Sequence, residues 1–361
     1  MANAIRAFHS MVEAGVRFTD FTLCSILKAL SELQGLRQGM QIHSWVCIAG
    51  CWSVVMASAL VDFYARCGRM QDAVHVFDGL RCEKDVAIYN ALLGGLVLNR
   101  QYGDAFLTLR RMKPNANALS CALDACAESS SLEYGKQIHS VMFRHGFDQD
   151  TISCNVLLDM YAKCGQMAAS RLVFDHIVEK NVVSWTSIID AYGSHGLGTE
   201  AFNLFKEMEK ESDVSPTSIT FLSVLSACGH SGLLEEGRQC FVSMTDKYGL
   251  EPSPEHYACY IDLLGRAGKF EEAWNIFCSL DKATRGVCIT MLYACKVSKD
   301  LVRGEIVARR LLELDPENPG IYVLISNFYS DLGRWEGAED LRKEMRTRGM
   351  RKEVGSSQVQ L

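Results

Sequence analysis

Proline and long apolar segments are both scarce in this chain. Six prolines occur among 361 residues, and because proline interrupts helices, long stretches are free to be helical. No apolar run reaches the roughly eighteen residues that a membrane-spanning helix needs. Residues 4–11, followed by Glu13, predict an amphipathic helix and not a signal or transit peptide. We therefore expect neither a membrane segment nor a targeting peptide in this sequence.

The chain also lacks the residue patterns of several catalytic and metal-binding sites. None of its nine histidines is followed two residues later by Glu, and no two cysteines have the spacing Cys-x-x-Cys. A zinc-dependent deaminase needs both patterns. Phosphate-binding loops and dinucleotide fingerprints are missing as well. We therefore expect no catalytic residues, no metal, no cofactor and no small-molecule substrate.

Positive charge is not in excess. The formal net charge is -6 at pH 7, whereas proteins that bind nucleic acids mainly through phosphates are usually basic. This balance counts against indiscriminate phosphate binding. It leaves open a local basic stripe or direct contacts with base edges.

Cysteine is the residue type that is unexpectedly frequent, with fifteen in the chain. Many occupy recurring apolar positions, for example Cys67, Cys126, Cys164, Cys228 and Cys295. Cysteines at such positions behave as small buried hydrophobic residues, and free thiols persist in a reducing compartment. We therefore predict a buried, structural role for them and no disulfide framework.

The sequence repeats itself at a nearly constant interval. The segment Tyr64–Gly68 (YARCG) recurs as Tyr161–Gly165 (YAKCG), an offset of 97 residues from Cys67 to Cys164. Two further motifs, Gln-Ile-His-Ser at His43 and His139 and Val-Phe-Asp, recur at nearly the same offset. Self-similarity of this kind indicates stacked repeats. The equivalent positions of His43 and His139 favour a packing or hydrogen-bonding role between helices over metal binding.

Each period holds three subunits, and each subunit has the pattern of two short helices. Apolar residues between Val156 and Tyr161 follow helical spacing. Gly165 then suits the positive φ that follows a helix C-terminus. A single helical hairpin cannot bury its apolar face alone, so neighbours must stack. The predicted fold is an all-α solenoid of stacked helix-turn-helix repeats.

The residues of these hairpins resemble one repeat family. Residues 182–189 (VVSWTSII) and 200–208 (EAFNLFKEM) resemble a standard pentatricopeptide (PPR) repeat. The YAKCG segments resemble its short (S) variant, and residues 223–228 (SVLSAC) resemble its long (L) variant. Alternating P, L and S repeats mark the plant PLS subclass, whose array is a right-handed superhelix.

The resemblance also implies a division of the chain. Residues 1–19 are predicted to be a truncated repeat, residues 20–284 the PLS array, residues 285–355 the extension (E) motifs and residues 356–361 a tail. The E motifs are indicated by residues 311–318 (LLELDPEN), 322–327 (YVLISN) and 333–335 (GRW). One P repeat, Val86–Asn115, is shorter than the family norm.

PPR proteins read one RNA base per repeat with two or three side chains, and the resemblance assigns this role to the fifth and last residues of each repeat. Asn, Ser, Thr and Asp can offer donors and acceptors to a base edge. The predicted RNA-binding pairs are Ser58 with Asp85, Asn90 with Asn115, Ser120 with Asp150, Asn155 with Asn181, and Thr186 with Thr217. Three pairs with an apolar or weakly polar fifth residue complete the series: Cys24 with Ser53, Leu222 with Ser253, and Ala258 with Thr284.

The C-terminal residues 342–352 form a basic cluster, from which we predict that Arg346, Arg348 and Arg351 hold RNA phosphates. The alternative is a solvated helix end, where cations are favourably placed. By resemblance, Asn/Asn pairs favour pyrimidines and the Ser58/Asp85 pair favours guanine.

The resemblance implies binding of single-stranded RNA in an organelle, with the mitochondrion expected and the chloroplast as the alternative. The expected role is site recognition for C-to-U editing, with a DYW-type deaminase acting in trans and multiple organellar RNA editing factor proteins as further partners. A role in RNA stability or splicing and a protein-interaction scaffold are the alternative functions.

Overall fold

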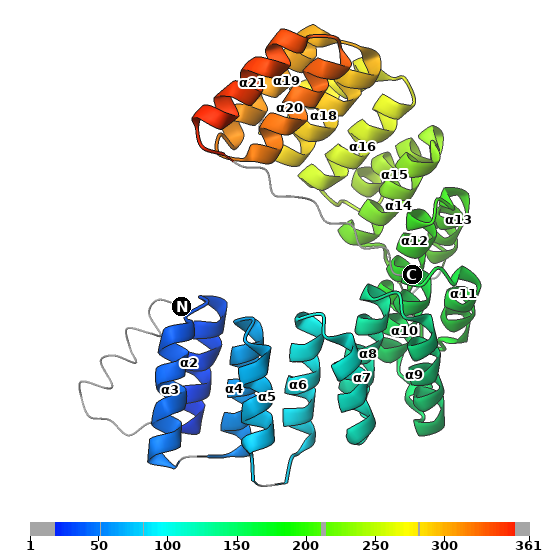
Figure 1. The fold of residues 1–361 in the computed structure, drawn as a ribbon. Coiled ribbons are helices and arrows are strands. Elements are labelled where there is room, and N and C mark those ends of the chain that lie inside the picture. The colour runs from blue at the N-terminus through cyan, green and yellow to red at the C-terminus, as the bar shows by residue number, and fades with distance from the viewer. Residues whose placement is uncertain (1–18, 51, 82, 211–213, 281, 351–361) are drawn as a thin grey trace. The chain divides into compact units, whose positions relative to one another are not determined.

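The computed structural model describes residues 19–50, 52–81, 83–210, 214–280 and 282–350 (Figure 1). Within these ranges the chain forms twenty α-helices and one short 3-10 helix, without any strand. The predicted all-α solenoid is thereby confirmed. The amphipathic helix predicted at the N-terminus, Arg351 and the predicted tail lie outside the described residues.

The helices belong to two compact units, residues 1–180 and residues 181–361. The first unit contains the following elements: α2 (Asp20–Glu32), α3 (Leu36–Ala49), α4 (Val54–Arg66), α5 (Met70–Gly79), α6 (Val86–Leu98), α7 (Tyr102–Arg111), α8 (Ala116–Glu128), α9 (Leu132–His145), η1 (Phe147–Gln149), α10 (Thr151–Lys163) and α11 (Met167–His176).

The second unit continues the same alternation of helices. Its elements are α12 (Val182–Ser194), α13 (Gly198–Met208), α14 (Ser218–Ser231), α15 (Leu234–Asp246), α16 (Pro254–Arg266), α17 (Phe270–Ser279), α18 (Arg285–Ser298), α19 (Leu301–Leu314), α20 (Pro319–Asp331) and α21 (Trp335–Thr347).

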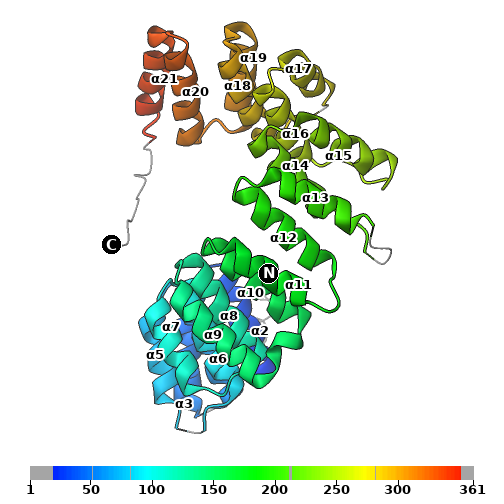
Figure 2. The same ribbon diagram turned by 90° about the vertical axis from the view of Figure 1, so that its right-hand side faces the viewer.

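Every even-numbered helix is the first helix of a hairpin, and the following odd-numbered helix is the second. Within each unit every first helix contacts the next first helix, most weakly at α18 and α20, and each second helix packs against its own first helix and against the first helix that follows (Figures 1 and 2). We call this succession of first helices the first-helix row. Residues at the same position of successive first helices therefore face the same side of a unit.

Helix boundaries follow local chemistry. The first helix of each predicted repeat begins at the repeat's first residue, after an N-cap of Ser, Thr, Asn or Asp. Gly165 follows α10 with φ +75°, as its place after a helix C-terminus predicts. In the short P repeat α6 and α7 keep ordinary lengths, and only residues 112–114 separate α7 from the next N-cap, Asn115. The shortening is therefore in the loop and not in the helices.

The core is built where first helices meet. Trp185 on α12 is 1% exposed, and Phe63 on α4 is likewise 1% exposed. In the second unit, two first helices approach each other closely at Gly193 on α12. A Cβ atom added there would lie 2.7 Å from the Cβ and 3.2 Å from the Cα of Ala227 on α14. Glycine at this position allows the two helix backbones to come together.

The cysteine prediction is correct for three of its five examples. Cys126, Cys228 and Cys295 are buried, but Cys67 and Cys164 are only half-buried. The last two are the C-cap residues of α4 and α10, where the helix end leaves one side open. All described cysteines are free thiols, and burial raises their pKa where a shift is resolved, to about 12 for Cys228.

The predicted role of the two equivalent histidines is confirmed. Nδ1 of His43 lies 2.8 Å from the hydroxyl of Tyr64, and Nδ1 of His139 lies 2.8 Å from the hydroxyl of Tyr161. Each contact joins the second helix of an L hairpin to the first helix of the S hairpin that follows. Burial lowers the pKa of both histidines and raises that of Tyr64 to about 12. The pairs are therefore neutral hydrogen bonds between hairpins.

Candidate nucleic-acid interface

The last residue of each predicted repeat has a structural role of its own. Each is the N-cap of the next first helix: Ser53, Asp85, Asn115, Asp150, Asn181, Thr217, Ser253 and Thr284. Asp85, for example, accepts a hydrogen bond from the backbone N–H of Ile88 at 3.1 Å. Ser, Thr, Asn and Asp are the preferred caps because their side-chain oxygens satisfy such N–H groups. Capping alone therefore accounts for polar residues at this position.

The fifth residue of each repeat is subject to no such requirement, because it lies in the second turn of the first helix. Ser58, Asn90, Ser120 and Thr186 are half-buried on the first-helix row. Asn155 is the least accessible, at 6% exposed. Capping therefore does not explain the polar side chains that recur at the fifth position in step with the repeat.

The structure brings two of the predicted pairs together. Nδ2 of Asn115 lies 3.4 Å from Oδ1 of Asn90. Thr186 and Thr217 meet through a third residue, since the hydroxyl of Thr220 lies 2.8 Å from that of Thr186 and 3.2 Å from that of Thr217. In both cases the fifth and last residues of one repeat form a joint polar edge beside the first helix.

The other pairs are organised differently. The hydroxyl of Ser58 donates to the carbonyl of Val54 within its own helix at 2.8 Å. Asp150 accepts hydrogen bonds from the hydroxyl and the N–H of Ser153, at 2.6 and 2.9 Å, and these bonds lower its pKa. Asn155 and Asn181 belong to different units, and Asn181 caps α12 through the N–H of Ser184 at 3.0 Å.

A set of cations on the first-helix row was not predicted from the sequence. Each S hairpin carries one at its thirteenth residue, eight residues after the fifth: Arg66, Lys163 and Arg266. Each pairs with an Asp one turn earlier, at 2.9, 2.8 and 2.8 Å, and each remains about half exposed. Residues four apart share a helix face, so these cations lie on the face of the fifth residues. The signal was present in the repeated YARCG and YAKCG motifs.

Carboxylates balance these cations and give the row a mixed charge. In the first unit, burial and the nearby Asp159 raise the pKa of Asp124, while Lys163 opposes that change. Three of the first-helix carboxylates, Asp62, Asp159 and Asp262, are the ion-pair partners of the cations. A surface of this kind suits recognition of polar base edges better than a uniform attraction for phosphates.

The basic cluster at the C-terminal helix is partly neutralised. The guanidinium of Arg348 lies 2.6 Å from the carboxylate of Glu344, and Lys343 pairs with Glu339 at 3.2 Å. Arg346 is exposed, and Arg351 lies outside the described residues. Arg342, Lys343 and Arg346 lie on α21, which is a second helix and does not belong to the first-helix row.

Among the described residues, no helix combines the length and apolar character needed to cross a bilayer. In the same residues, no group of three His, Cys, Asp or Glu side chains is arranged to hold a metal ion.

Stacked hairpins with polar residues in register along their first helices define a helical-repeat protein. Sequence profiles identify which one. The PPR repeat profile matches residues 55–84, 87–113, 152–182, 219–248 and 255–283, and the PPR repeat family profile matches residues 180–230. The profile of the E motif matches residues 298–360.

Relatives agree with the profiles. A mitochondrial pentatricopeptide repeat-containing protein of Arabidopsis thaliana is 43% identical over 98% of this chain and 68% of its own length. A chloroplastic one from the same plant is 38% identical over 99% of the chain but only 38% of its own length. The chain belongs to the pentatricopeptide repeat family and carries an E motif. It spans between about a third and two thirds of the curated relatives it matches.

Among solved structures, the chain resembles PPR10 in complex with an 18-nt psaJ RNA element. The TM-score is 0.71 at 16% identity, covering 96% of this chain and 53% of that one. The match to PPR10 from maize without RNA has a TM-score of 0.56 at 17% identity, covering 97% of this chain and 57% of that one. These likenesses confirm the repeat fold.

Proposed function

We propose that the chain binds single-stranded RNA in a sequence-specific manner along its first-helix row. The observation that carries this proposal is the recurrence of polar fifth residues beside polar last residues, with Asn90 and Asn115 forming one joint edge. PPR10, which shares the fold, was crystallised with an RNA element. The mixed charge of the row also favours base contacts over phosphate attraction.

Capping and base reading are compatible in one side chain. The cap uses one oxygen: Asn115 accepts from the N–H of Ala118 at 3.0 Å through Oδ1, and its amide NH2 points to the pair partner. An Asn in this position presents a donor, whereas the second carboxylate oxygen of an Asp such as Asp85 presents an acceptor. Guanine offers ring N–H and amine donors, so Asp85 suits it. Pyrimidines opposite Asn90/Asn115 and Asn155/Asn181 remain the companion prediction.

The E motif supports a finer role, site recognition for C-to-U RNA editing in an organelle. In this proposal the chain binds near the edited cytidine, and a DYW-type deaminase acts in trans with multiple organellar RNA editing factor proteins. The names of relatives include both mitochondrial and chloroplastic proteins, which supports an organellar location, with the mitochondrion preferred. The purified chain is expected to hold no stoichiometric zinc and to deaminate no cytidine.

The direct test is binding of short single-stranded RNAs to the purified chain. One RNA places guanine opposite Ser58/Asp85 and pyrimidines opposite the two Asn pairs, and a matched RNA of the same length exchanges these bases. We expect tighter binding of the first RNA, and loss of that preference at one position in the Asn90→Ala variant. Equal binding of both RNAs refutes sequence-specific reading.

A protein-interaction scaffold is the second candidate, favoured by the net charge of -6. It predicts no RNA binding at moderate salt together with a saturable peptide or protein ligand. A role in RNA stability or splicing would keep the RNA preference. In that case an organelle extract depleted of the protein would show unchanged editing but altered transcript levels or splicing.

A further inference from the structure

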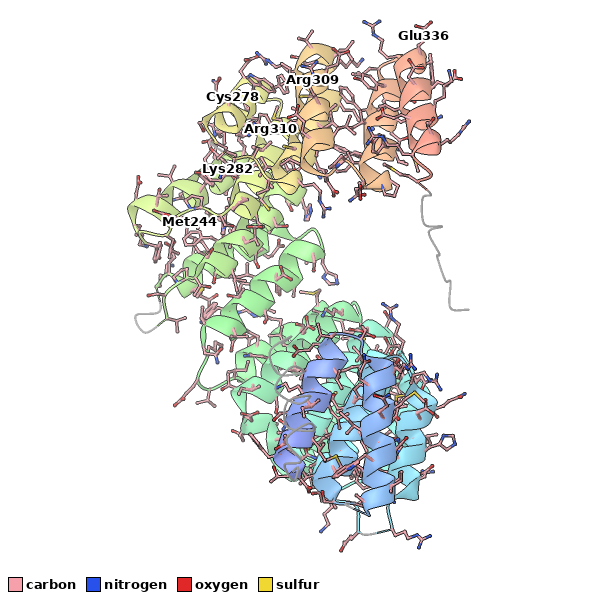
Figure 3. All side chains as sticks on the ribbon, turned by 90° about the vertical axis from the view of Figure 1, so that its left-hand side faces the viewer. Met244, Cys278, Lys282, Arg309, Arg310 and Glu336 are labelled. Atoms are coloured by element: carbon pink, nitrogen blue, oxygen red, sulfur yellow. The ribbon has the colours of Figure 1, made fainter. Side chains whose placement is uncertain are left out.

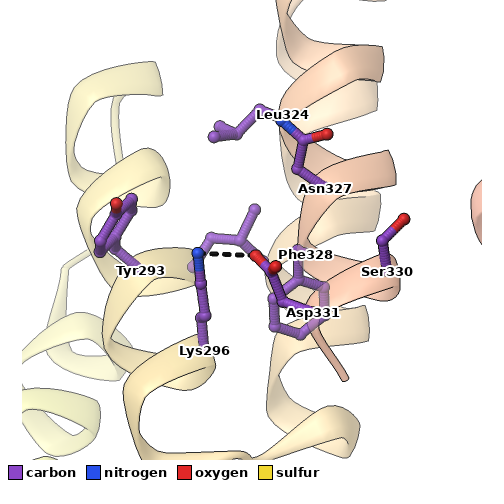
Figure 4. Close-up of a pocket in the computed structure, with 8 residues that line it drawn as sticks. Tyr293, Lys296, Leu324, Asn327, Phe328, Ser330 and Asp331 are labelled. Carbon is purple, nitrogen blue, oxygen red and sulfur yellow. Dashed lines mark ion pairs between the residues drawn. The ribbon is translucent and has the colours of Figure 1, made fainter. Parts of the chain in front are cut away.

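The row of first helices continues into the E motif, where two successive first helices lie further apart. Helices α12, α14, α16 and α18 pack successively, but α18 and α20 touch at few points. Between them lies a pocket of about 370 Å³ (Figure 4). A ligand that follows the first-helix row of the second unit therefore reaches this pocket directly after the last predicted repeat.

An aromatic side chain and a cation form one side of the pocket. Tyr293 on α18 is 53% exposed. The amine of Lys296 lies 5.2 Å from the centroid of the Tyr293 ring and 2.6 Å from the carboxylate of Asp331 on α20 (Figure 4). Asp331 thus holds the cation beside the ring and across the pocket.

The rest of the lining is a firm apolar floor with polar groups at its rim. Leu292 and Phe328 are each 2% exposed, so they belong to the packed core and do not need to rearrange. Asn327 and Ser330 on α20 add hydrogen-bonding groups (Figure 4). An apolar site with a few polar groups is typical of pockets for small molecules.

The pocket residues lie one helical turn beyond the position of the predicted base-reading fifth residues. Counted from the start of α18, Ile289 is the fifth residue and Tyr293 the ninth, one turn further along the same face. Asn327 is the ninth residue of α20. Both therefore occupy the place that Asp62 and Asp159 hold on the first-helix row of the repeats.

We propose that this pocket stacks an unpaired nucleobase of the bound RNA on Tyr293, with Lys296 beside its phosphate. This inference rests on the proposed RNA-binding function and extends it beyond the repeats. Base stacking on an aromatic ring tolerates any base, because every base has a π-face. The pocket would therefore hold the strand downstream of the reading repeats without adding sequence preference. A lone exposed tyrosine paired with a cation fits a base better than it fits a peptide, which would need a longer apolar groove.

A scan with abasic RNA tests the assignment. The sequence-matched RNA is extended by several nucleotides past the last repeat, and one abasic site is moved along the extension. We expect one position at which base removal weakens binding about 5- to 150-fold, whichever base is removed. The Tyr293→Ala variant should bind intact RNA equally weakly and should no longer respond to the abasic site at that position. Tyr293→Phe should restore both properties.

The control variant is Trp335→Ala. Trp335 is 69% exposed and lines a separate depression of about 830 Å³ formed by residues of α19, α20 and α21. Arg309 and Glu336, which are labelled in Figure 3, line the same depression. It belongs to a second helix and should leave RNA affinity unchanged.

Three outcomes overturn the proposal. If the extended RNA binds but the abasic scan is flat and Tyr293→Ala binds normally, the nucleobase assignment fails while the proposed function stands, and the pocket is left to a protein partner. If Trp335→Ala weakens binding as much as Tyr293→Ala, the effect is not specific to the pocket. If the chain binds no RNA at all, both proposals fail together.

Discussion

Replacing Asn115 separates the capping role of a last residue from its proposed base-reading role, because the two involve different atoms of the side chain. Its Oδ1 accepts from the N–H of Ala118 at 3.0 Å, and its Nδ2 faces Oδ1 of Asn90 at 3.4 Å. Asn115→Asp keeps an oxygen for the cap and exchanges the donor for an acceptor. Asn115→Ala removes both.

The expected magnitudes differ for stability and for binding. Asp and Asn are nearly equal as N-caps, whereas loss of the cap costs about 1 kcal/mol. In a unit of this size, the loss of the cap in Asn115→Ala should lower the unfolding midpoint by roughly 2–4 °C. Asn115→Asp should leave the midpoint unchanged. For binding, exchanging a donor for an acceptor misplaces one hydrogen bond, worth about 1–3 kcal/mol, or roughly 5- to 150-fold in affinity. Cytosine should lose most, because its ring N3 is an acceptor, and bases with a ring N–H should gain.

Circular dichroism melts and fluorescence anisotropy with four RNAs that differ at one base measure the two effects. The matched control is Ser253→Asn, which keeps a capping residue but pairs with Leu222, a side chain unable to hydrogen-bond a base. That variant should change neither quantity appreciably. If Asn115→Asp melts like the unmodified chain and keeps its base preference, Asn115 is a cap only, and the reading role of last residues is wrong.

Three further predictions concern stability and charge. The pKa values of His43 and His139 are lowered in the folded chain, so below about pH 6.5 the unfolded chain binds protons that the folded chain does not, and stability falls as the pH decreases below that value. Urea titrations at pH 7.5 and 5.5 should therefore show a smaller loss of unfolding free energy at the lower pH for the His43→Gln/His139→Gln variant than for the unmodified chain. An equal loss in the two proteins contradicts this. Gly193→Ala should destabilise the second unit by about 1–3 kcal/mol through overpacking against Ala227. Gly94→Ala is the control, because the added Cβ would meet only Cys121 Sγ, at 3.9 Å. This substitution should be neutral or stabilising. If both variants have similar unfolding midpoints, a tight contact between the helices at Gly193 is excluded. Replacing Arg346, Arg348 and Arg351 by Gln should weaken all RNAs alike and flatten the log–log salt dependence by about 0.7 for each phosphate that is no longer neutralised, whereas an unchanged slope would assign the cluster to helix-end solvation.

Much of the fold follows from the sequence because its signals are local and repeated. The first helices begin where caps and repeat register place them, and Gly165 has the positive φ that its position after α10 predicts. The role of His43 and His139 could also be predicted, since two histidines at the same position of equivalent repeats are expected to make the same contact.

The parts that sequence reasoning missed depend on distances between helices. Neutralisation of Arg348 by Glu344 needs the geometry of one turn, although the carboxylate was visible in the sequence. The pocket beside Tyr293 exists because α18 and α20 separate, and no pattern within either helix encodes that separation. Half-burial of Cys67 and Cys164 likewise depends on what covers a helix end.

The position of the last residue at a helix N-cap has a consequence for how such a protein can change its target. Ser, Thr, Asn and Asp can replace one another at that position with little loss of stability, whereas other side chains leave a backbone N–H of the helix without its acceptor. These four differ in the donors and acceptors that they can offer to a base. In the proposed base-reading role, a substitution of one of these residues for another would alter the RNA that is recognised while the solenoid stays folded. Helix capping would thus set the residue types that are available for base reading at this position, and new RNA targets would arise by single substitutions without compensating changes elsewhere.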